Sequence, residues 1–295
     1  MKKSLINRKL DKDIKKEFDS IGRTFDSYVD FGQEMYKKLF EEFKEDELST
    51  PLFTIFIHIL NMIDSISILS KKGATEGIIP LCRSLFEAAV YFEHAYTEPR
   101  KEGIIAYHVH YIQQEIKYRN MFNTSTNSGK ETFKVLRKEL PHFNLDENSL
   151  DHDKTKYLYQ FLEKDEVKEV YQDWIEKKPK QWYSLYTNCK NLRELSRKLG
   201  IETLYIMLYK TASDFIHAGA TLRNIKVSDG NGGVSVRNFE EMPFYCNMAF
   251  FIINRVYQLI SLEQFNLWYP QEAQKVVART SQIQIKAEYE IGVLK

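Results

Sequence analysis

Turn-forming residues are scarce in this sequence. Its 295 residues include only 12 Gly and 7 Pro, and sheet-rich folds of this length usually need more of both at their turns. Hydrophobic residues make up 43% and charged residues 28% of the chain, which is the composition of a soluble globular protein. The sequence therefore predicts an all-α fold, a multi-helix bundle.

Cysteine is equally rare, and its spacing excludes two classes of protein. Cys82, Cys189 and Cys246 are far apart and odd in number, so they form neither a paired zinc motif nor a disulfide framework. Reduced thiols fit a cytoplasmic location. We expect Cys82 to be a packed side chain, and an activated thiol beside Arg83 is the alternative.

An excess of charge of either sign is also missing. The 42 basic and 41 acidic residues leave a net charge of +1, which predicts no strong nonspecific attraction to nucleic acid, although a local basic patch stays open. The N-terminal stretch MKKSLINRKLDKDIKKEF has no continuous apolar segment after its basic residues. It is therefore not a secretory signal.

Two apolar runs, residues 51–70 and 243–260, come nearest to the length of a transmembrane helix. Polar side chains interrupt both, among them His58 and Asp64 in the first and Arg255 in the second. Polar groups are costly in lipid. We expect two buried core helices and no membrane partner.

The motifs of common catalytic and metal sites are absent. The sequence has no HExxH, no G-x-S-x-G and no paired C-x-x-C. The two histidines of 108-HVH-110 point to different sides of a helix, which disfavours a metal pair. The segment DGNGG is followed by no Lys-Ser/Thr, so it indicates a tight turn rather than a phosphate loop. No metal and no cofactor are expected.

The pattern along the chain divides it into three predicted parts. Residues 1–48 form an N-terminal amphipathic helical segment with a break near Gly32, residues 49–268 form the helical-bundle core domain, and residues 269–295 form a C-terminal tail. Within the core domain, the alternating runs IKVS and VSVR flank DGNGG and predict one small β-hairpin insertion at about residues 225–238.

Aromatic residues are abundant, with 18 Tyr and 19 Phe. We expect them to fill the core and a subunit interface. Together with the amphipathic N-terminal helix, this surplus predicts a homodimer.

The stretch 209-YKTASDFIHAG-219 is an apolar helix that carries a row of polar side chains. Tyr209, Ser213 and His217 are spaced by four, so they share one helix face. Histidine exchanges protons near neutral pH and is a candidate general acid or base. A satisfied core histidine is the alternative. Two further polar residues of the stretch are candidate ligand contacts, Lys210 and Asp214.

A second helix, 78-IIPLCRSLFEAAVYF-92, carries Arg83 and Glu87 in the same relation. Charges among apolar residues must face partners or a wet cavity, and a guanidinium there is well shaped to hold phosphate. A buried ion pair that fixes helix register is the alternative. His58 is a further candidate, with core packing preferred, and Arg223, six residues past the histidine above, is an alternative phosphate ligand. We expect the two helices to meet at one polar site.

Three segments in this order carry a resemblance: 83-RSLFEAAVYF-92, 182-WYSLYTNCKNLRELSRKLG-200 and 205-YIMLYKTASDFIHAG-219. Together they resemble a family of bacterial all-helical proteins known only as a domain of unknown function, over roughly residues 50 to 260. The resemblance implies an all-α fold and no established activity.

Some members of that family resemble HEPN proteins, helical dimers that include many toxins and antiviral effectors acting as metal-independent ribonucleases. The HEPN signature is an arginine followed four to six residues later by histidine. Here Lys210 precedes His217 by seven, and the pair Arg137 and His142 is interrupted by Pro141. A ribonuclease of this kind would therefore need Arg83 as its phosphate contact.

Three interpretations remain open. The first is a nuclease or nucleotide-processing enzyme of a bacterial defence or toxin system, with catalytic residues Arg83, Glu87, Ser213 and His217. The second is a noncatalytic sensor or partner subunit of such a system that binds a nucleotide or small ligand through these residues. The third is a structural scaffold. The near-neutral charge favours a small ligand or one short RNA segment over a long nucleic-acid groove.

Overall fold

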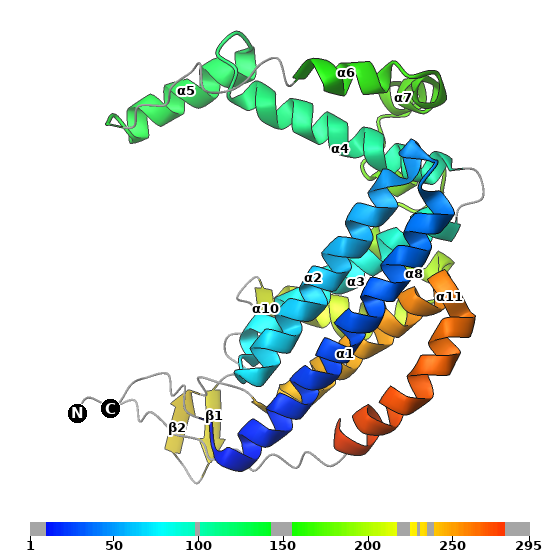
Figure 1. Cartoon of the computed structure of the whole chain (residues 1–295). Helices are drawn as coiled ribbons and strands as arrows, with labels where there is room; N and C mark the ends of the chain where they lie inside the picture. Colours follow the sequence, from blue (N-terminus) through cyan, green and yellow to red (C-terminus); the bar gives the residue numbers. More distant parts are fainter. Residues whose placement is uncertain are drawn as a thin grey trace. The chain divides into compact units, whose positions relative to one another are not determined.

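The computed structural model describes residues 10–97, 101–142, 155–216, 225–228, 231–234 and 239–280. Its fold is a bundle of helices (Figure 1), which confirms the all-α prediction. The chain divides into two compact units, one made of residues 1–96 with 192–295 and the other of residues 97–191. The predicted boundaries at residues 48 and 268 stay a prediction.

The first unit contains the long helices of the fold and several short ones. Its elements, in chain order, are α1 (Lys12–Phe43), η1 (Glu47–Ser49), α2 (Thr50–Lys71), α3 (Thr75–Thr97), α8 (Leu192–Lys198), α9 (Glu202–Leu204), η4 (Tyr205–Lys210), α10 (Thr211–Ile216), β1 (Ile225–Ser228), β2 (Asn231–Val234), η6 (Phe239–Glu241) and α11 (Met242–Thr280).

α1 follows the predicted amphipathic pattern. Asp11 caps its first turn by accepting a hydrogen bond from the backbone N–H of Asp13 at 2.9 Å, and apolar side chains at three- and four-residue steps are buried against α2 and α11. The predicted break near Gly32 is wrong, because the helix is continuous there. A Cβ at Gly32 would collide with Leu60 and the hydroxyl of Tyr257, so glycine allows the close packing of α1.

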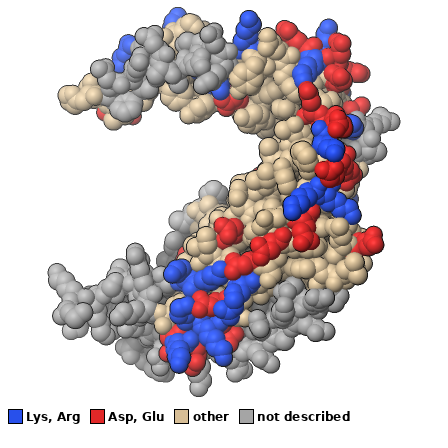
Figure 2. Space-filling view, viewed as in Figure 1, with Lys and Arg blue, Asp and Glu red and all other residues tan. Residues whose placement is uncertain are grey.

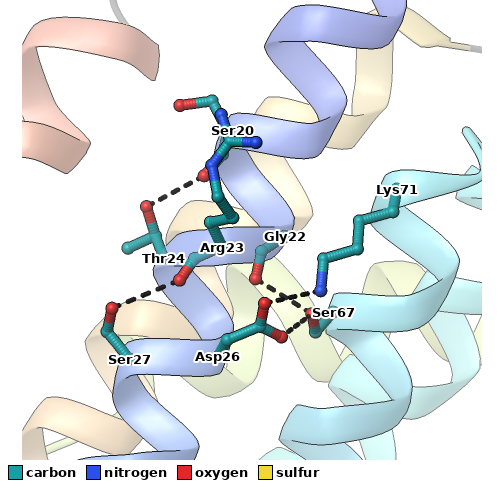
Figure 3. A network of polar contacts seen from close by, with 8 residues as sticks. All are labelled: Ser20, Gly22, Arg23, Thr24, Asp26, Ser27, Ser67 and Lys71. Atoms are coloured by element: carbon teal, nitrogen blue, oxygen red, sulfur yellow. Dashed lines mark hydrogen bonds and ion pairs between the residues drawn. The ribbon is translucent and has the colours of Figure 1, made fainter.

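A polar network joins α1 to α2 (Figure 3). The Asp26 carboxylate accepts hydrogen bonds from the Ser67 hydroxyl at 2.6 Å and the Lys71 ammonium at 2.5 Å, and the Ser67 hydroxyl also lies 2.9 Å from the carbonyl oxygen of Gly22. Burial raises the pKa of Asp26, but the hydrogen bonds from Lys71 and Ser67 outweigh it, so the pKa is lowered overall. The network fixes the register of α2 along α1.

α11 closes the core of this unit with aromatic contacts. Phe250 stacks on Phe25 with ring centroids 4.1 Å apart. The backbone leaves helical geometry at Ser261, and beyond this kink Trp268 stacks on Phe31 at 4.3 Å. Figure 1 shows the bend, which brings the second half of α11 back toward α1. α11 continues to Thr280, beyond the predicted end of the core at residue 268.

One buried ion pair ties three helices of the unit together. The carboxylate of Glu93 on α3, which is 5% exposed, accepts two hydrogen bonds from the Arg255 guanidinium on α11, each 2.5 Å long. Arg255 also donates to the carbonyl oxygen of Leu199, just after α8, at 2.7 Å. The buried carboxylate is thereby paired, while the Arg255 side chain stays 39% exposed.

The predicted core helix at residues 51–70 forms most of α2. One of its faces is buried, including Ile59, Ile63 and Ile66, whereas Ile57 and Ile68 are 41% and 53% exposed. In the described part of the chain, the segment Glu47–Lys71 is long and apolar enough to cross a membrane by length and composition. The expectation of no membrane partner stays a prediction.

β1 and β2 pair antiparallel, with Ile225 opposite Val234. β2 covers Asn231–Val234, three residues earlier than the predicted strand VSVR. Residues 229–230 and 235–238 lie outside the described residues. A hairpin spanning about residues 225–238 therefore stays a prediction.

The second unit is organised around one central helix. α4 (Glu102–Met121) packs against each of its other elements, namely α5 (Asn127–Glu139), α6 (Lys156–Leu162), α7 (Asp165–Lys177) and η3 (Trp182–Ser184).

The two histidines of α4 face different neighbours, as their spacing predicts. His108 contacts Phe161 with ring centroids 4.0 Å apart, and His110 contacts Trp174 at 5.4 Å. Burial lowers the pKa of both imidazoles, that of His108 to about 4. Among the residues that the structure describes, no group of three or more His, Cys, Asp or Glu side chains could hold a metal ion.

We predict that His94 makes the protein less stable in mild acid. His94 on α3 is 3% exposed, and burial, with a smaller effect of Lys198, lowers its pKa to about 4. An unfolded chain binds the proton near pH 6.5. The stabilising contribution is therefore complete above about pH 6.5 and is lost as the pH falls toward 4, up to about 3 kcal/mol from a shift of this size.

Urea unfolding of the full chain at pH 7.5 and pH 5 measures this effect. The His94→Gln variant should lose less stability between the two pH values than the wild type. His58→Gln, which changes an exposed histidine of α2, is the matched control and should behave as the wild type. Equal losses in wild type and His94→Gln would contradict the assignment.

Candidate functional site

α3 presents Arg83 and Glu87 on one face, one helical turn apart. Their neighbours Cys82, Leu85 and Phe86 are buried in the core. The side chains of Arg83 and Glu87 stay 26% and 32% exposed. The helix therefore holds a pair of opposite charges at the boundary between the core and solvent.

The second contributor is the segment of residues 205–216. The sequence predicts a regular helix here, but the structure forms a π-helix, η4, followed by α10. Leu208 and Ala212 anchor the segment in the core, and both are 0% exposed. Tyr209 and Ser213 lie beside them, half-buried, with the Ser213 hydroxyl donating to the carbonyl oxygen of Tyr209 at 2.7 Å. π-Helical turns are rare and are frequent at functional sites.

The two segments meet at the Arg83 guanidinium. Its Nε donates to the Ser213 hydroxyl at 3.0 Å, and its Nη2 donates to the Tyr209 hydroxyl at 2.6 Å. The guanidinium carbon lies 4.3 Å from the centroid of the Tyr209 ring. Arg83 is thereby fixed in position and orientation by residues that follow it by more than a hundred positions.

Glu87 completes the cluster. Its Oε2 lies 3.8 Å from Nη1 of Arg83 and 3.4 Å from the Tyr209 hydroxyl, which donates to it. Its Oε1 accepts a hydrogen bond from the Tyr91 hydroxyl at 2.9 Å. Tyr209 thus accepts from the arginine and donates to the glutamate. We call Arg83, Glu87, Tyr91, Tyr209 and Ser213 the Arg83 cluster.

Tyr209 stays protonated in this environment. Burial and the negative charge of Glu87 raise the pKa of its phenol, and the nearby Arg83 only partly offsets them. Its ring stacks on Tyr205 with centroids 5.1 Å apart and tilts against Phe86 at 5.9 Å. The phenol is therefore a neutral, well-held hydrogen-bond donor near neutral pH.

The structure brings together four of the residues singled out in the sequence: Arg83, Glu87, Tyr209 and Ser213. Lys210 and Asp214 are exposed next to them along the segment. His217 and Arg223 lie outside the described residues.

His58 is exposed on α2. The expectation that it packs in the core is wrong, because it lies on the outward face of that helix. Cys82, by contrast, is packed as expected. Its thiol lies 3.4 Å from the carbonyl oxygen of Tyr245, and burial raises its pKa well above the usual value. Such a thiol is not an activated nucleophile.

Tyr91 is the member of the cluster that the sequence analysis did not identify. It follows Glu87 by four residues, so the same spacing rule that pairs Arg83 with Glu87 would place it on their face. Aromatic residues are expected in the core and at an interface, so residue type alone does not indicate this role for Tyr91.

The cluster offers both hydrogen-bond donors and an acceptor to a ligand. A guanidinium has five N–H donors, and Ser213 and Tyr209 engage two of them. The Glu87 carboxylate accepts hydrogen bonds only. A ligand that meets the remaining N–H groups must be an acceptor, and one that meets Glu87 must be a donor.

Comparison with known protein families gives one match. Residues 49–233 match the model of DUF5677, a family of unknown function. This is more than half of the chain, so the protein belongs to DUF5677, and the predicted membership of a family of unknown function is confirmed. No curated protein and no solved structure matches the chain. Both segments of the Arg83 cluster lie within the matched region.

Proposed function

We propose that the Arg83 cluster binds a phosphate-bearing small ligand, a nucleotide or one phosphate of a short RNA segment. The observation that carries the proposal is a guanidinium held by two side chains while a quarter of its side chain stays exposed. A pre-positioned guanidinium loses little conformational entropy on binding, and it matches the geometry of phosphate oxygens.

The chain itself provides a comparison for the alternative, a purely structural ion pair. Arg255 and Glu93 form two hydrogen bonds of 2.5 Å around a carboxylate that is 5% exposed. Arg83 and Glu87 approach to only 3.8 Å, and the Glu87 side chain is 32% exposed. The two arginines do not differ in this direction, since Arg255 is 39% and Arg83 26% exposed. The longer separation and the open carboxylate favour a binding role for the Arg83 pair.

The distribution of charge supports a small ligand. The whole chain carries a net charge of only +1. Figure 2 shows separate groups of basic and acidic side chains on the face that it presents, and the charged residues of α1 come in short runs of one sign followed by the other. Proteins that track a long nucleic-acid backbone need a continuous basic surface.

We expect nucleotides to stabilise the protein through Arg83. A ligand present at a hundred times its Kd adds about 2.7 kcal/mol to the free energy of unfolding, which raises Tm by about 5–10 °C in a domain of this size. Arg83→Met removes the phosphate contact and should abolish the shift. Differential scanning fluorimetry with a panel of nucleoside mono-, di- and triphosphates measures it.

The control for this experiment is Arg193→Met. Arg193 is an exposed arginine of α8 that pairs with Glu202 outside the Arg83 cluster, so its variant should keep the full shift. An equal shift in wild type and Arg83→Met, or no shift with any member of the panel, would overturn the proposal.

A second candidate function is a metal-independent ribonuclease. The protein would act as a cytoplasmic homodimer, together with a partner protein, in a bacterial defence or toxin–antitoxin system. This function is favoured because Tyr209 and Ser213 both contact Arg83, and His217 follows Ser213 in the sequence by the same spacing of four residues. In this function Arg83 holds the phosphate and His217 takes the proton of the ribose 2′-hydroxyl. The 2′-oxygen attacks phosphorus, the bond to the 5′-oxygen breaks, that oxygen takes a proton from water, and a 2′,3′-cyclic phosphate and a free 5′-hydroxyl form.

For this second candidate, we expect the purified protein to cleave total RNA in the presence of EDTA. His217→Ala should lower the rate by about 10²- to 10⁴-fold, the usual contribution of a general acid or base, with Tm unchanged. Gel electrophoresis of the RNA measures cleavage, and His58→Ala is the control. Activity that survives in His217→Ala, or no cleavage by the wild type, excludes this candidate and leaves the binding site in place.

A further inference from the structure

Glu87 has an unused hydrogen-bonding capacity beside the proposed phosphate contact. Its Oε1 is held by the Tyr91 hydroxyl at 2.9 Å, whereas among the described residues Oε2 has two long contacts, 3.4 Å to the Tyr209 hydroxyl and 3.8 Å to Nη1 of Arg83. Each oxygen of a carboxylate offers two acceptor positions. Tyr91 therefore fixes the orientation of the carboxylate while Oε2 keeps room for a donor from a ligand.

We propose that Glu87 accepts a hydrogen bond from the ribose 2′-hydroxyl, so that the site selects ribonucleotides over deoxyribonucleotides. This inference rests on the proposed binding of a phosphate-bearing ligand by Arg83. The charge of Glu87 would repel a second phosphate, but a hydroxyl group brings no charge and supplies the donor that Oε2 lacks. Carboxylates bind ribose hydroxyls in this way in dinucleotide-binding folds.

The spacing of the two groups suits one nucleotide. Nη1 of Arg83 and Oε2 of Glu87 lie 3.8 Å apart, so the phosphate of a nucleotide and a hydroxyl of its own ribose reach neighbouring groups of the site. The remaining N–H groups of Arg83 meet the phosphate, and Glu87 meets the sugar. The 2′-hydroxyl is the group that distinguishes RNA from DNA at a given site.

Calorimetric titration of the full chain tests the inference. The probes are AMP, GMP, CMP and UMP, each paired with its 2′-deoxy counterpart. The ribonucleotide of at least one pair should bind about 10- to 100-fold more tightly, the range expected for one hydrogen bond to a charged group. Glu87→Ala should bring this ratio close to one, and Glu87→Gln, whose amide oxygen still accepts, should retain part of it.

Glu76→Ala, which removes another glutamate of α3 in its first turn, is the matched control and should keep the wild-type ratio. Equal affinity of the wild type for ribo- and deoxyribonucleotides, with binding lost in Arg83→Met, would overturn the role of Glu87 and leave the phosphate site standing. Absence of binding to every probe would overturn the phosphate site and the inference together.

Discussion

The contact of one guanidinium with two side chains of a distant segment determines the organisation of the candidate site. Arg83 on α3 bonds to Ser213 and Tyr209, which lie 130 and 126 residues further along the chain. The planar fork of arginine donates in two directions at once, which the point charge of lysine cannot do. The Tyr209 hydroxyl also donates to Glu87, so the position of Tyr209 restrains that carboxylate. The geometry of the whole cluster therefore depends on the orientation of Arg83.

Two arginine–glutamate pairs of the same unit differ in the burial of their carboxylates. Glu93 is buried, and Arg255 surrounds it with short hydrogen bonds that link α3 to α11 and to the end of α8. Removing Arg255 would take the guanidinium away from a buried carboxylate. The Arg83 cluster has similar chemistry with a longer separation and a more exposed carboxylate. In the proposed function, its remaining donors and its acceptor meet a ligand.

Much of this arrangement follows from local rules. The low content of Gly and Pro predicts the all-α fold, and the spacing of four predicts which faces carry Arg83 with Glu87 and Tyr209 with Ser213. Such rules act within one helix. They predict the participants of the cluster because each row of polar side chains on a largely apolar helix must find partners.

Other features depend on contacts that no local pattern contains. The π-helix at Tyr205–Lys210 reflects how Leu208 and Ala212 anchor in the core. The pairing of Glu93 with Arg255 joins residues 162 positions apart, so Arg255 looked in the sequence like an interruption of an apolar run. His58 was misplaced because both faces of α2 are apolar, and periodicity alone does not indicate which of them is buried.

The central claim, that the Arg83 cluster is an open binding site rather than a structural ion pair, is tested most directly by comparing two matched variants. Urea unfolding at pH 7.5 gives the free energy of unfolding of Arg83→Met and Arg255→Met. The account predicts a loss of about 1 kcal/mol or less for Arg83→Met, whose partner Glu87 is 32% exposed. It predicts about 3–5 kcal/mol for Arg255→Met, whose partner Glu93 is buried. A loss for Arg83→Met as large as that for Arg255→Met would contradict it, because the cluster would then serve to hold the fold together.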